Sequence, residues 1–228
     1  RSYEPRRGKW SSFAPFPCEG KLSNVDRTSF LVDDLDTADR YKLTTGLIVP
    51  RPIGWIGTTS VDGVPNLAPY SFFNAVATNP PVLMFSTGVF GGVIKDSLQN
   101  IRDTGEFTAS LVDHDLAVAM NDSSATLTPD VDEFEKTGLT AVEFGQVNAP
   151  GVEEAKAIIE CKAVHEVQFG DPDGLHHAIT FGEVLAFHID SDVLDGTRID
   201  PAELDALGRL AGTDYATTRD RFRLDRPD

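Results

Sequence analysis

Residues 51–74, RPIGWIGTTSVDGVPNLAPYSFFN, contain the two strands and the turn around which the rest of the chain is organised. Residues 52–59 are rich in β-branched and aromatic side chains and show no helical periodicity, which predicts a strand. The Asp62-Gly63 pair favours the positive φ angles of a tight turn, so residues 61–64 are predicted to reverse the chain. Residues 66–74 are predicted to form the return strand.

Pro69 gives the return strand a special position in its sheet. Proline cannot donate a ladder hydrogen bond, so this strand is predicted to be an edge strand, or to be irregular at that point. Neighbouring backbone N–H and C=O groups are then free to bind a partner other than a strand. A planar heterocycle with its own donors and acceptors is such a partner.

A second feature is a glycine-rich connection at residues 88–92, between a predicted buried strand at 82–85 and a short helix. Gly105 is predicted to end this helix. Free N–H groups at a helix start attract anions, and here Lys95 adds a charge and Ser97 a hydroxyl. The pattern by itself favours plain capping by Asp96 or Ser97, with Lys95 in solvent, because glycine loops before helices are common.

The remaining patterns predict a mainly β protein. Further strands are expected at residues 106–112, 155–169 and 178–189, with Gly182 allowing a bulge or a close approach. Short helices are expected at 36–47, 113–121 and 131–137, and residues 207–215 have a loop-like composition. About six mostly antiparallel strands favour a barrel, and no GxGxxG follows a strand, so a Rossmann nicotinamide domain is not expected.

Domain organisation follows from the absence of a linker. Residues 36–228 are predicted to be one domain, which a chain of 228 residues is long enough to fold around a buried core. Residues 1–35 form a predicted arm. Its Trp10, Phe13 and Phe16 are poorly suited to solvent, so we expect the arm to pack on the domain or on a dimer partner.

The composition excludes several classes of function. A net charge of −16 disfavours nucleic acid and anionic membranes as partners. No apolar run is long enough to cross a bilayer and no leader pattern is present, so a cytoplasmic location is expected. Cys18 and Cys161 make no disulfide framework. The histidines lack metal-ligand spacing and no GxSxG occurs, so neither a metal site nor a serine hydrolase is predicted.

Several motifs occur together in a fixed order. They are PRPIGWIGTTSVDGVPNLAPYSFFNAVATNPPVLMFS at 50–86, KDSLQNIRDTGEF at 95–107, AMNDSS at 119–124, DEFEKTGLT at 132–140, IECKAV at 159–164, HHAITFGEVLAFHID at 176–190 and LGRLAGTDY at 207–215. This set, which spans residues 40–228, resembles the flavin reductase-like proteins, the family of FMN-binding split barrels that includes flavoredoxins and NAD(P)H:flavin oxidoreductases. The resemblance implies a six-stranded antiparallel split β-barrel with short peripheral helices.

The resemblance also implies a set of site residues. Asn66, Ser71 and Phe72 are expected at the flavin, and Thr58, Thr59 and the backbone from Ala68 through Tyr70 to Phe72 at its pyrimidine side. The flavin phosphate is expected at Lys95, Asp96 and Ser97, and Arg209 and Tyr215 are further candidates for cofactor binding. If the chain acts on its own organic substrate, these two residues and the N-terminal arm are expected to wall that substrate's pocket. His177 matches a histidine placed near flavin and nicotinamide, although a lone histidine at a strand start is also typical of an ordinary surface residue.

The implied activity is hydride transfer from NAD(P)H to FMN, with FAD as a possible replacement, because flavins carry the reactive chemistry in their own ring. A homodimer is implied, and reduced flavin could supply a partner monooxygenase. Two alternatives remain open. One is an FMN enzyme that acts on its own small organic substrate, and the other is a flavoredoxin-like electron carrier.

Overall fold

The structure is a computed structural model that describes residues 26–89, 92–125, 127–128, 131–171 and 174–227. The chain divides into two units, with the boundary between Arg40 and Tyr41. In the first unit, Arg40 Nε donates to the carbonyl oxygen of Val32 at 3.0 Å, at the start of a 3-10 helix, η1 (Val32–Asp34). Trp10, Phe13 and Phe16 lie outside the described residues, so the packing of the arm stays a prediction.

The helices are α1 (Thr37–Leu47), α2 (Asp96–Thr104), α3 (Ala117–Asp122), α4 (Glu133–Thr137) and α5 (Pro201–Leu204), with a second 3-10 helix, η2 (Ser191–Val193). The strands are β1 (Arg51–Pro52), β2 (Gly54–Thr59), β3 (Pro65–Tyr70), β4 (Phe73–Thr78), β5 (Pro81–Gly88), β6 (Glu106–Leu111), β7 (Ala141–Val142), β8 (Gly151–Val152), β9 (Ala157–Asp171), β10 (Gly174–Ile189), β11 (Leu194–Asp195), β12 (Arg198–Ile199), β13 (Leu207–Arg209) and β14 (Tyr215–Thr217). No helix among the described residues is long and apolar enough to span a membrane.

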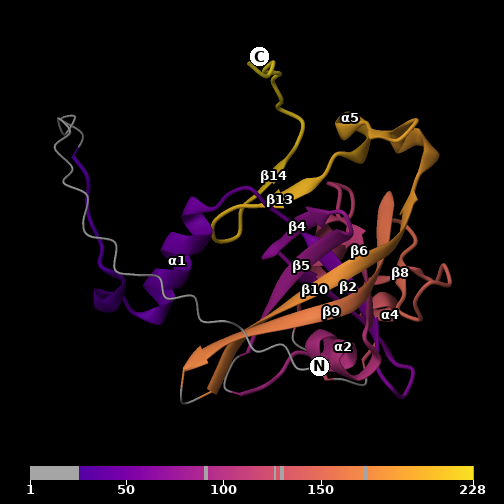
Figure 1. Cartoon of the computed structure of the whole chain (residues 1–228), viewed down its shortest axis with the longest axis horizontal. Coiled ribbons are helices and arrows are strands. Elements are labelled where there is room, and N and C mark those ends of the chain that lie inside the picture. Colours follow the sequence, from indigo (N-terminus) through magenta and orange to yellow (C-terminus); the bar gives the residue numbers. More distant parts are fainter. Residues whose placement is uncertain (1–25, 90–91, 126, 129–130, 172–173, 228) are drawn as a thin grey trace. The chain divides into compact units, whose positions relative to one another are not determined.

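The largest sheet closes on itself. Its antiparallel strands run in the order β3-β2-β6-β9-β10-β5-β4 (Figure 1). The two edge strands, β3 and β4, are separated in the chain only by Ser71 and Phe72. Both edges must therefore meet at these two residues, although β3 and β4 do not pair with each other. The predicted fold, a mainly β split barrel, is confirmed.

The six strands expected are not what the main sheet shows, since in the described residues it has seven strands. The predicted return strand at 66–74 is in fact the end of β3 and the start of β4. At Ser71 and Phe72 the chain leaves β2 and begins to pair with β5, where Ser86 N donates to Phe72 O at 2.9 Å. Pro69 does lie in an edge strand, as predicted. Its neighbour Leu67 donates its N–H away from β2, to Glu133 Oε2 at 3.0 Å.

The local turn signals are confirmed. Gly63 has a φ of +83°, and Ser60 N donates to Val64 O at 2.9 Å across the hairpin turn. Gly105, with a φ of +76°, ends α2 and donates its N–H to Ile101 O at 2.8 Å. Positive φ values favour glycine because a Cβ atom would clash with the backbone there.

Gly182 makes the predicted close approach. A Cβ atom at this position would lie 2.3 Å from Phe107 Cζ, and the register of β10 against β9 shifts between Phe181 and Gly182. The Phe107 ring fills the barrel interior in the space that a side chain would take. Other residues of this interior core are Ile56, Phe73, Leu83, Phe85, Ile101, Ala109 and Cys161.

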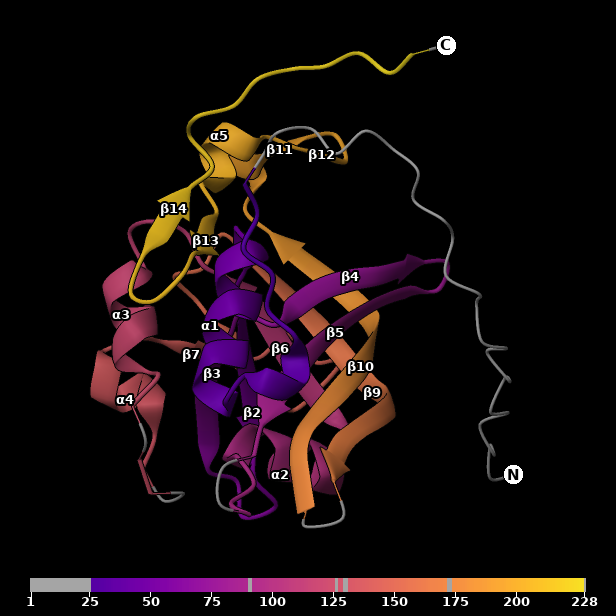
Figure 2. The ribbon, with the colours of Figure 1, turned by 90° about the vertical axis from the view of Figure 1, so that its left-hand side faces the viewer.

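A second core lies on the other face of β2, which is buried on both sides. Trp55 and Ile53 point into it, whereas Ile56 points into the barrel. Met120 from α3 and Phe134 from α4 cover this face. Trp55 Nε1 donates to Ser123 Oγ at 2.9 Å, which satisfies its one polar group. In Figure 2, α3 and α4 lie on one flank of the barrel.

The C-terminal segment corrects one expectation, because residues 207–215 are not simply a loop. β13 pairs with both β1 and β14 in a separate three-stranded sheet (Figure 2). Gly208 permits this pairing, since a Cβ atom there would lie 2.8 Å from Pro50 Cβ. Two short strands joined by a glycine-containing bend give too little alternation to be recognised from sequence.

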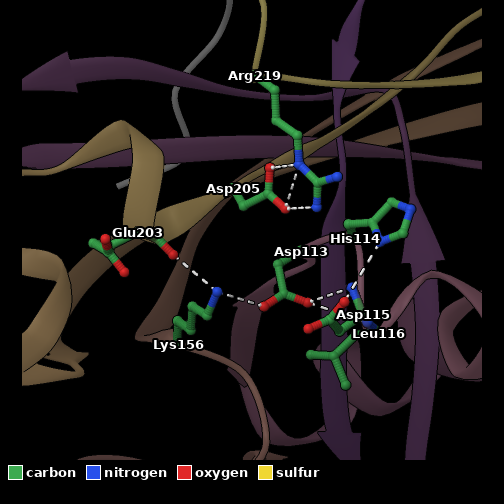
Figure 3. Close-up of polar contacts among 8 residues, drawn as sticks. All are labelled: Asp113, His114, Asp115, Leu116, Lys156, Glu203, Asp205 and Arg219. Carbon is green, nitrogen blue, oxygen red and sulfur yellow. Dashed lines mark hydrogen bonds and ion pairs between the residues drawn. The ribbon is translucent and has the colours of Figure 1, made fainter.

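Two ion pairs and a hydrogen bond lie where this segment meets the barrel (Figure 3). Arg219 donates from Nε and Nη2 to both carboxylate oxygens of Asp205, at 2.6 to 3.1 Å. Lys156 Nζ lies 3.0 Å from Asp113 Oδ2 and donates to Glu203 O at 2.8 Å. Asp113 is also held by the backbone N–H groups of Asp115 and Leu116. These contacts link α5 and its flanks to the start of α3 and the start of β9.

Candidate functional site

Three consecutive residues at the seam between β3 and β4 take part in three different groups of side chains. Tyr70 reaches a buried polar cluster, Ser71 lines a cavity, and Phe72 lies beside His177. Successive side chains of an extended strand point to opposite faces, and the break after Tyr70 separates the directions further. The seam is therefore the point where most of the predicted site residues converge.

The buried polar cluster consists of Thr58, Asn66, Tyr70, Ser97 and Asn100. Asn66 Nδ2 donates to Thr58 Oγ1 at 3.1 Å and to Ser97 Oγ at 3.0 Å. Tyr70 OH donates to Ser97 Oγ at 3.1 Å, and Asn100 Nδ2 donates to Thr58 Oγ1 at 3.1 Å. The cluster ties β2 and β3 to α2.

Burial decides what this cluster can do. Ser97 is 1% exposed and Thr58 is 0% exposed, and their hydroxyl oxygens already accept two hydrogen bonds each. Burial raises the pKa of Tyr70 to about 12, so its phenol stays neutral and keeps donating at ordinary pH. The cluster thus fixes the position of α2, and direct ligand contacts by Thr58, Asn66 and Ser97 stay predictions.

The arginine cavity is lined by Ser71, Arg209 and Tyr215, and its volume is about 100 Å³. The rest of its wall is formed by Ile53, Pro69, Met120 and Ser124. Arg209 lies over the Tyr215 ring, with Cζ 4.5 Å from the ring centroid. It also donates from Nη1 to Tyr215 OH and from Nη2 to Gly212 O.

Arg51 stands behind this cavity and is 6% exposed. Its Nε donates to Ser71 Oγ at 3.4 Å. Its two terminal nitrogens donate to three backbone carbonyl groups, those of Thr45 and Ile48 at the end of α1 and that of Leu210 at 2.9 Å. One guanidinium therefore joins α1, the seam and the C-terminal hairpin, which is how Ser71 comes to lie near Arg209.

The third group is an aromatic rim formed by Phe72 and His177. The two ring centroids are 6.4 Å apart, with an interplanar angle of 40°. His177 pairs with Gly88 across β10 and β5, directly before the glycine-rich connection. Val89 N donates to His176 O at 2.8 Å, so the start of that connection is fixed to β10. Both rings are half-buried.

Some predicted site residues lie apart from the seam. Thr59 is at the other end of the β2–β3 hairpin, about 17 Å away at the usual rise per strand residue, and donates to Asn148 O at 3.0 Å. Lys95 and Asp96 lie at the start of α2 and are half-buried. Lys95 occupies the N-cap position and makes no side-chain cap hydrogen bond, so capping by Asp96 or Ser97 is wrong.

Sequence reasoning missed two residues, Arg51 and Asn100. Arg51 stands between two prolines at the start of the first strand, where an arginine facing solvent is unremarkable. Asn100 is 7% exposed in α2 and occurs in the run that the family motifs already include. A burial pattern along α2 would have identified Asn100. No sequence signal identifies Arg51, because its contacts with Ser71 and Leu210 depend on the packed chain.

Other titratable groups of the barrel have structural roles. Burial would raise the pKa of Glu160, but hydrogen bonds from His188 and from the N–H groups of Gln146 and Val147 outweigh it and hold that pKa below its usual value. Cys161 in β9 is a buried free thiol, and its burial raises its pKa, which disfavours the reactive thiolate. Cys18 lies outside the described residues. Within the described part of the chain, no three His, Cys, Asp or Glu side chains gather as a metal site.

Comparisons with known proteins give consistent matches. A family model described as Flavin reductase like domain matches residues 46–204. The structure of nitrilotriacetate monooxygenase component B from Bacillus cereus is similar with a TM-score of 0.85 and 34% identity, covering 88% of this chain and 100% of that one. The structure of 2-nitrobenzoate 2-nitroreductase NbaA from Pseudomonas fluorescens is similar with a TM-score of 0.80 and 28% identity, covering 88% of this chain and 96% of that one. A split barrel domain protein from Shewanella frigidimarina, with a TM-score of 0.74 and 24% identity over 86% and 96%, shows the fold alone.

Proposed function

Because the chain belongs to the flavin reductase-like family, we propose that it is an FMN-binding oxidoreductase that transfers a hydride from NAD(P)H to the flavin. Bound flavin would supply the redox chemistry in its own ring. The observation that carries the proposal is the match to a monooxygenase component over the whole length of that protein, at 34% identity. A partner monooxygenase that receives reduced flavin is part of the proposal.

The residues at the seam fit a flavin. β3 is an edge strand that already donates the Leu67 N–H away from β2. Since alternate residues of an antiparallel strand point to the same side, the carbonyl group of Pro69 also faces away from β2, beyond the point where Glu133 of α4 covers Leu67. The seam adds the aromatic ring of Phe72 and the Ser71 hydroxyl. Together these groups offer stacking and hydrogen bonds to a planar heterocycle.

The start of α2 is the proposed phosphate position. The N–H groups of Asp96 and Ser97 begin the helix without intrahelical acceptors, and Lys95 adds a positive charge. Ser97 would contribute its backbone rather than its buried hydroxyl. His177, at the aromatic rim, is proposed to orient the nicotinamide or to hold a proton, since its ring is half-buried beside Phe72.

A homodimer completes the proposal. The outer faces of β4, β9 and β10 expose a set of apolar side chains: Val76, Val164, Phe169, Leu185 and Phe187, each between 43% and 57% exposed. Apolar groups gathered in this way are typical of a protein interface. A second copy of the chain would cover them and exclude water from the flavin. Light scattering of the purified chain tests this, and a strict monomer would contradict it.

The activity is tested by steady-state oxidation of NADH and NADPH with FMN or FAD as the only acceptor. We expect turnover with at least one nicotinamide. His177→Ala should slow flavin reduction while FMN affinity stays close to that of the wild type, whereas the control His114→Ala, at a histidine outside the seam, should change neither. The absence of turnover with all four combinations would refute the proposed reductase activity.

A second candidate is an FMN enzyme that reduces its own organic substrate, which the 28% identity to a nitroreductase favours. The arginine cavity beside the seam would then hold part of that substrate. The two candidates differ in one measurement. An organic substrate that accelerates NAD(P)H oxidation at a fixed, saturating FMN concentration favours the second candidate, whereas release of reduced FMN to a separate acceptor favours the first.

A further inference from the structure

The polar groups that line the arginine cavity are arranged as hydrogen-bond donors. Ser71 Oγ accepts from Arg51, so its own O–H is free to donate. Tyr215 OH accepts from Arg209, so its O–H is free in the same way. Arg209 uses one N–H on Tyr215 and one on Gly212 O, and a guanidinium has five. Ser124, the remaining polar wall residue, already donates to Asn121 O at 2.6 Å.

The positive charge at the cavity is not balanced. Among the described residues, neither Arg51 nor Arg209 has a carboxylate oxygen within the 4.0 Å of an ion pair. Arg51 is bound only to a hydroxyl and to carbonyl oxygens, which carry partial charges. Burial lowers the pKa of Arg51, which Tyr41 partly opposes, and the nearby charge of Arg209 lowers it as well. A buried charge is normally paired.

We propose that the arginine cavity binds an oxyanion, the carboxylate of an organic acid on which the flavin acts. The phosphate of the flavin is the competing source, and its binding here would replace the phosphate position proposed at the start of α2. The guanidinium of Arg209 presents a fork of N–H groups that matches a carboxylate or a phosphate. The two free hydroxyls of Ser71 and Tyr215 would complete the hydrogen bonds. The unbalanced arginines are the more notable because the chain as a whole has a net charge of −16.

The size and the walls of the cavity restrict what enters it. Its volume of about 100 Å³ holds a group of a few heavy atoms, since one water takes about 30 Å³. The charged end of a ligand therefore fits inside, with the remainder outside against the seam. Ile53, Pro69 and Met120 form an apolar wall, which strengthens a charged hydrogen bond by excluding water.

The proposal is tested by binding rather than by turnover. Benzoate and its neutral counterpart benzamide are titrated into the FMN-free full chain and followed by line broadening of the ligand signals in NMR. FMN and riboflavin, which differ by the phosphate, are titrated by flavin fluorescence. The variants are Arg209→Gln, Tyr215→Phe, which keeps the ring under Arg209, and the control Arg198→Gln, which removes an exposed arginine elsewhere.

For a carboxylate ligand, benzoate affinity falls about tenfold or more in Arg209→Gln and several-fold in Tyr215→Phe, because a charge-assisted hydrogen bond is lost. The benzoate affinity of Arg198→Gln and the benzamide affinities of all variants stay unchanged. Arg209→Gln then changes the affinities for FMN and riboflavin by the same factor. For the flavin phosphate, Arg209→Gln weakens FMN about tenfold and leaves riboflavin unchanged. Either pattern supports the oxyanion site and identifies its ligand.

Unchanged affinities for both benzoate and FMN in Arg209→Gln would overturn the proposal. Equal binding of benzoate and benzamide, together with equal binding of FMN and riboflavin, would overturn it as well. The proposal rests on the proposed function only for the identity of the ligand. A chain that binds benzoate through Arg209 but oxidises neither NADH nor NADPH would keep the anion site and refute the reductase.

Discussion

The C-terminal segment carries two arginines whose surroundings differ. Arg219 donates to both oxygens of Asp205, and close by Lys156 is paired with Asp113 (Figure 3). Ten residues before Arg219, Arg209 lies over a tyrosine ring and donates to a hydroxyl and a carbonyl. Arg51 beside it is likewise surrounded by neutral acceptors. One region balances its charges within the chain, and the other does not.

The difference separates two uses of charge. Paired side chains satisfy each other and need nothing from outside, and Lys156 in addition holds the segment through its hydrogen bond to Glu203 O. Arginines that are surrounded by neutral groups keep their full charge available to a ligand. The paired group thus positions the segment, and the unpaired group supplies the chemistry of the cavity.

Arg51→Met should have the largest effect on stability. It removes the donor to three carbonyl groups and to Ser71, and each buried acceptor left without a partner costs roughly 1 to 3 kcal/mol. We expect the free energy of unfolding to fall by about 3 kcal/mol, measured by urea denaturation. Arg198→Met, at an exposed arginine, is the control and should change little. If Arg51→Met is as stable as the wild type, Arg51 does not join α1 to the seam.

A smaller effect on stability is expected when the hydrogen bond between Glu160 and His188 is removed, and it appears only at acidic pH. The pKa of Glu160 is lower in the folded chain than in the unfolded one, so its charge stabilises the fold above the unfolded value of about 4.3. That contribution is lost as the pH falls through the lowered pKa of the folded state. In Glu160→Gln the free energy of unfolding should therefore fall less steeply as the pH is lowered from about 6 to 3, measured by denaturation at each pH.

The Glu160 prediction has an internal control. Glu135→Gln changes an exposed carboxylate in α4, so the acid dependence should match that of the wild type. If the free energy of unfolding of Glu160→Gln depends on acidic pH as the wild type does, the hydrogen bonds from His188, Gln146 and Val147 do not stabilise the charged carboxylate.

The smallest effect is expected at the exposed pair of Arg219 and Asp205. Arg219 has a side-chain exposure of 60%, and solvent and salt screen such a pair strongly. Arg219→Gln should lower the melting temperature slightly in low salt, and high salt should remove the difference. Its effect on benzoate binding should be nil, in contrast to Arg209→Gln. A loss of benzoate binding in Arg219→Gln would contradict the separation of the two regions.

Much of the architecture could be predicted from residues 51–74 and the motifs after them. The Asp62-Gly63 turn, the edge position of Pro69 and the end of α2 at Gly105 all follow from local preferences of φ or from a missing N–H. The break at Ser71 could not be predicted, because nothing in an alternating run shows where a strand changes its partner. The short strands β13 and β14 were missed for a similar reason.

Local sequence fixes the long strands, the turns and the small polar residues of the seam, because these depend on backbone preferences and alternation within a few neighbours. Only the tertiary structure decided which of them share a site. Closure of the barrel joins β3 to β4, and the pairing of β1 with β13 lets Arg51 donate to Leu210, 159 positions away. Ser97 is buried, and neither Arg51 nor Arg209 has a carboxylate within ion-pair distance in the part of the chain that the structure describes; both are properties of the packed chain.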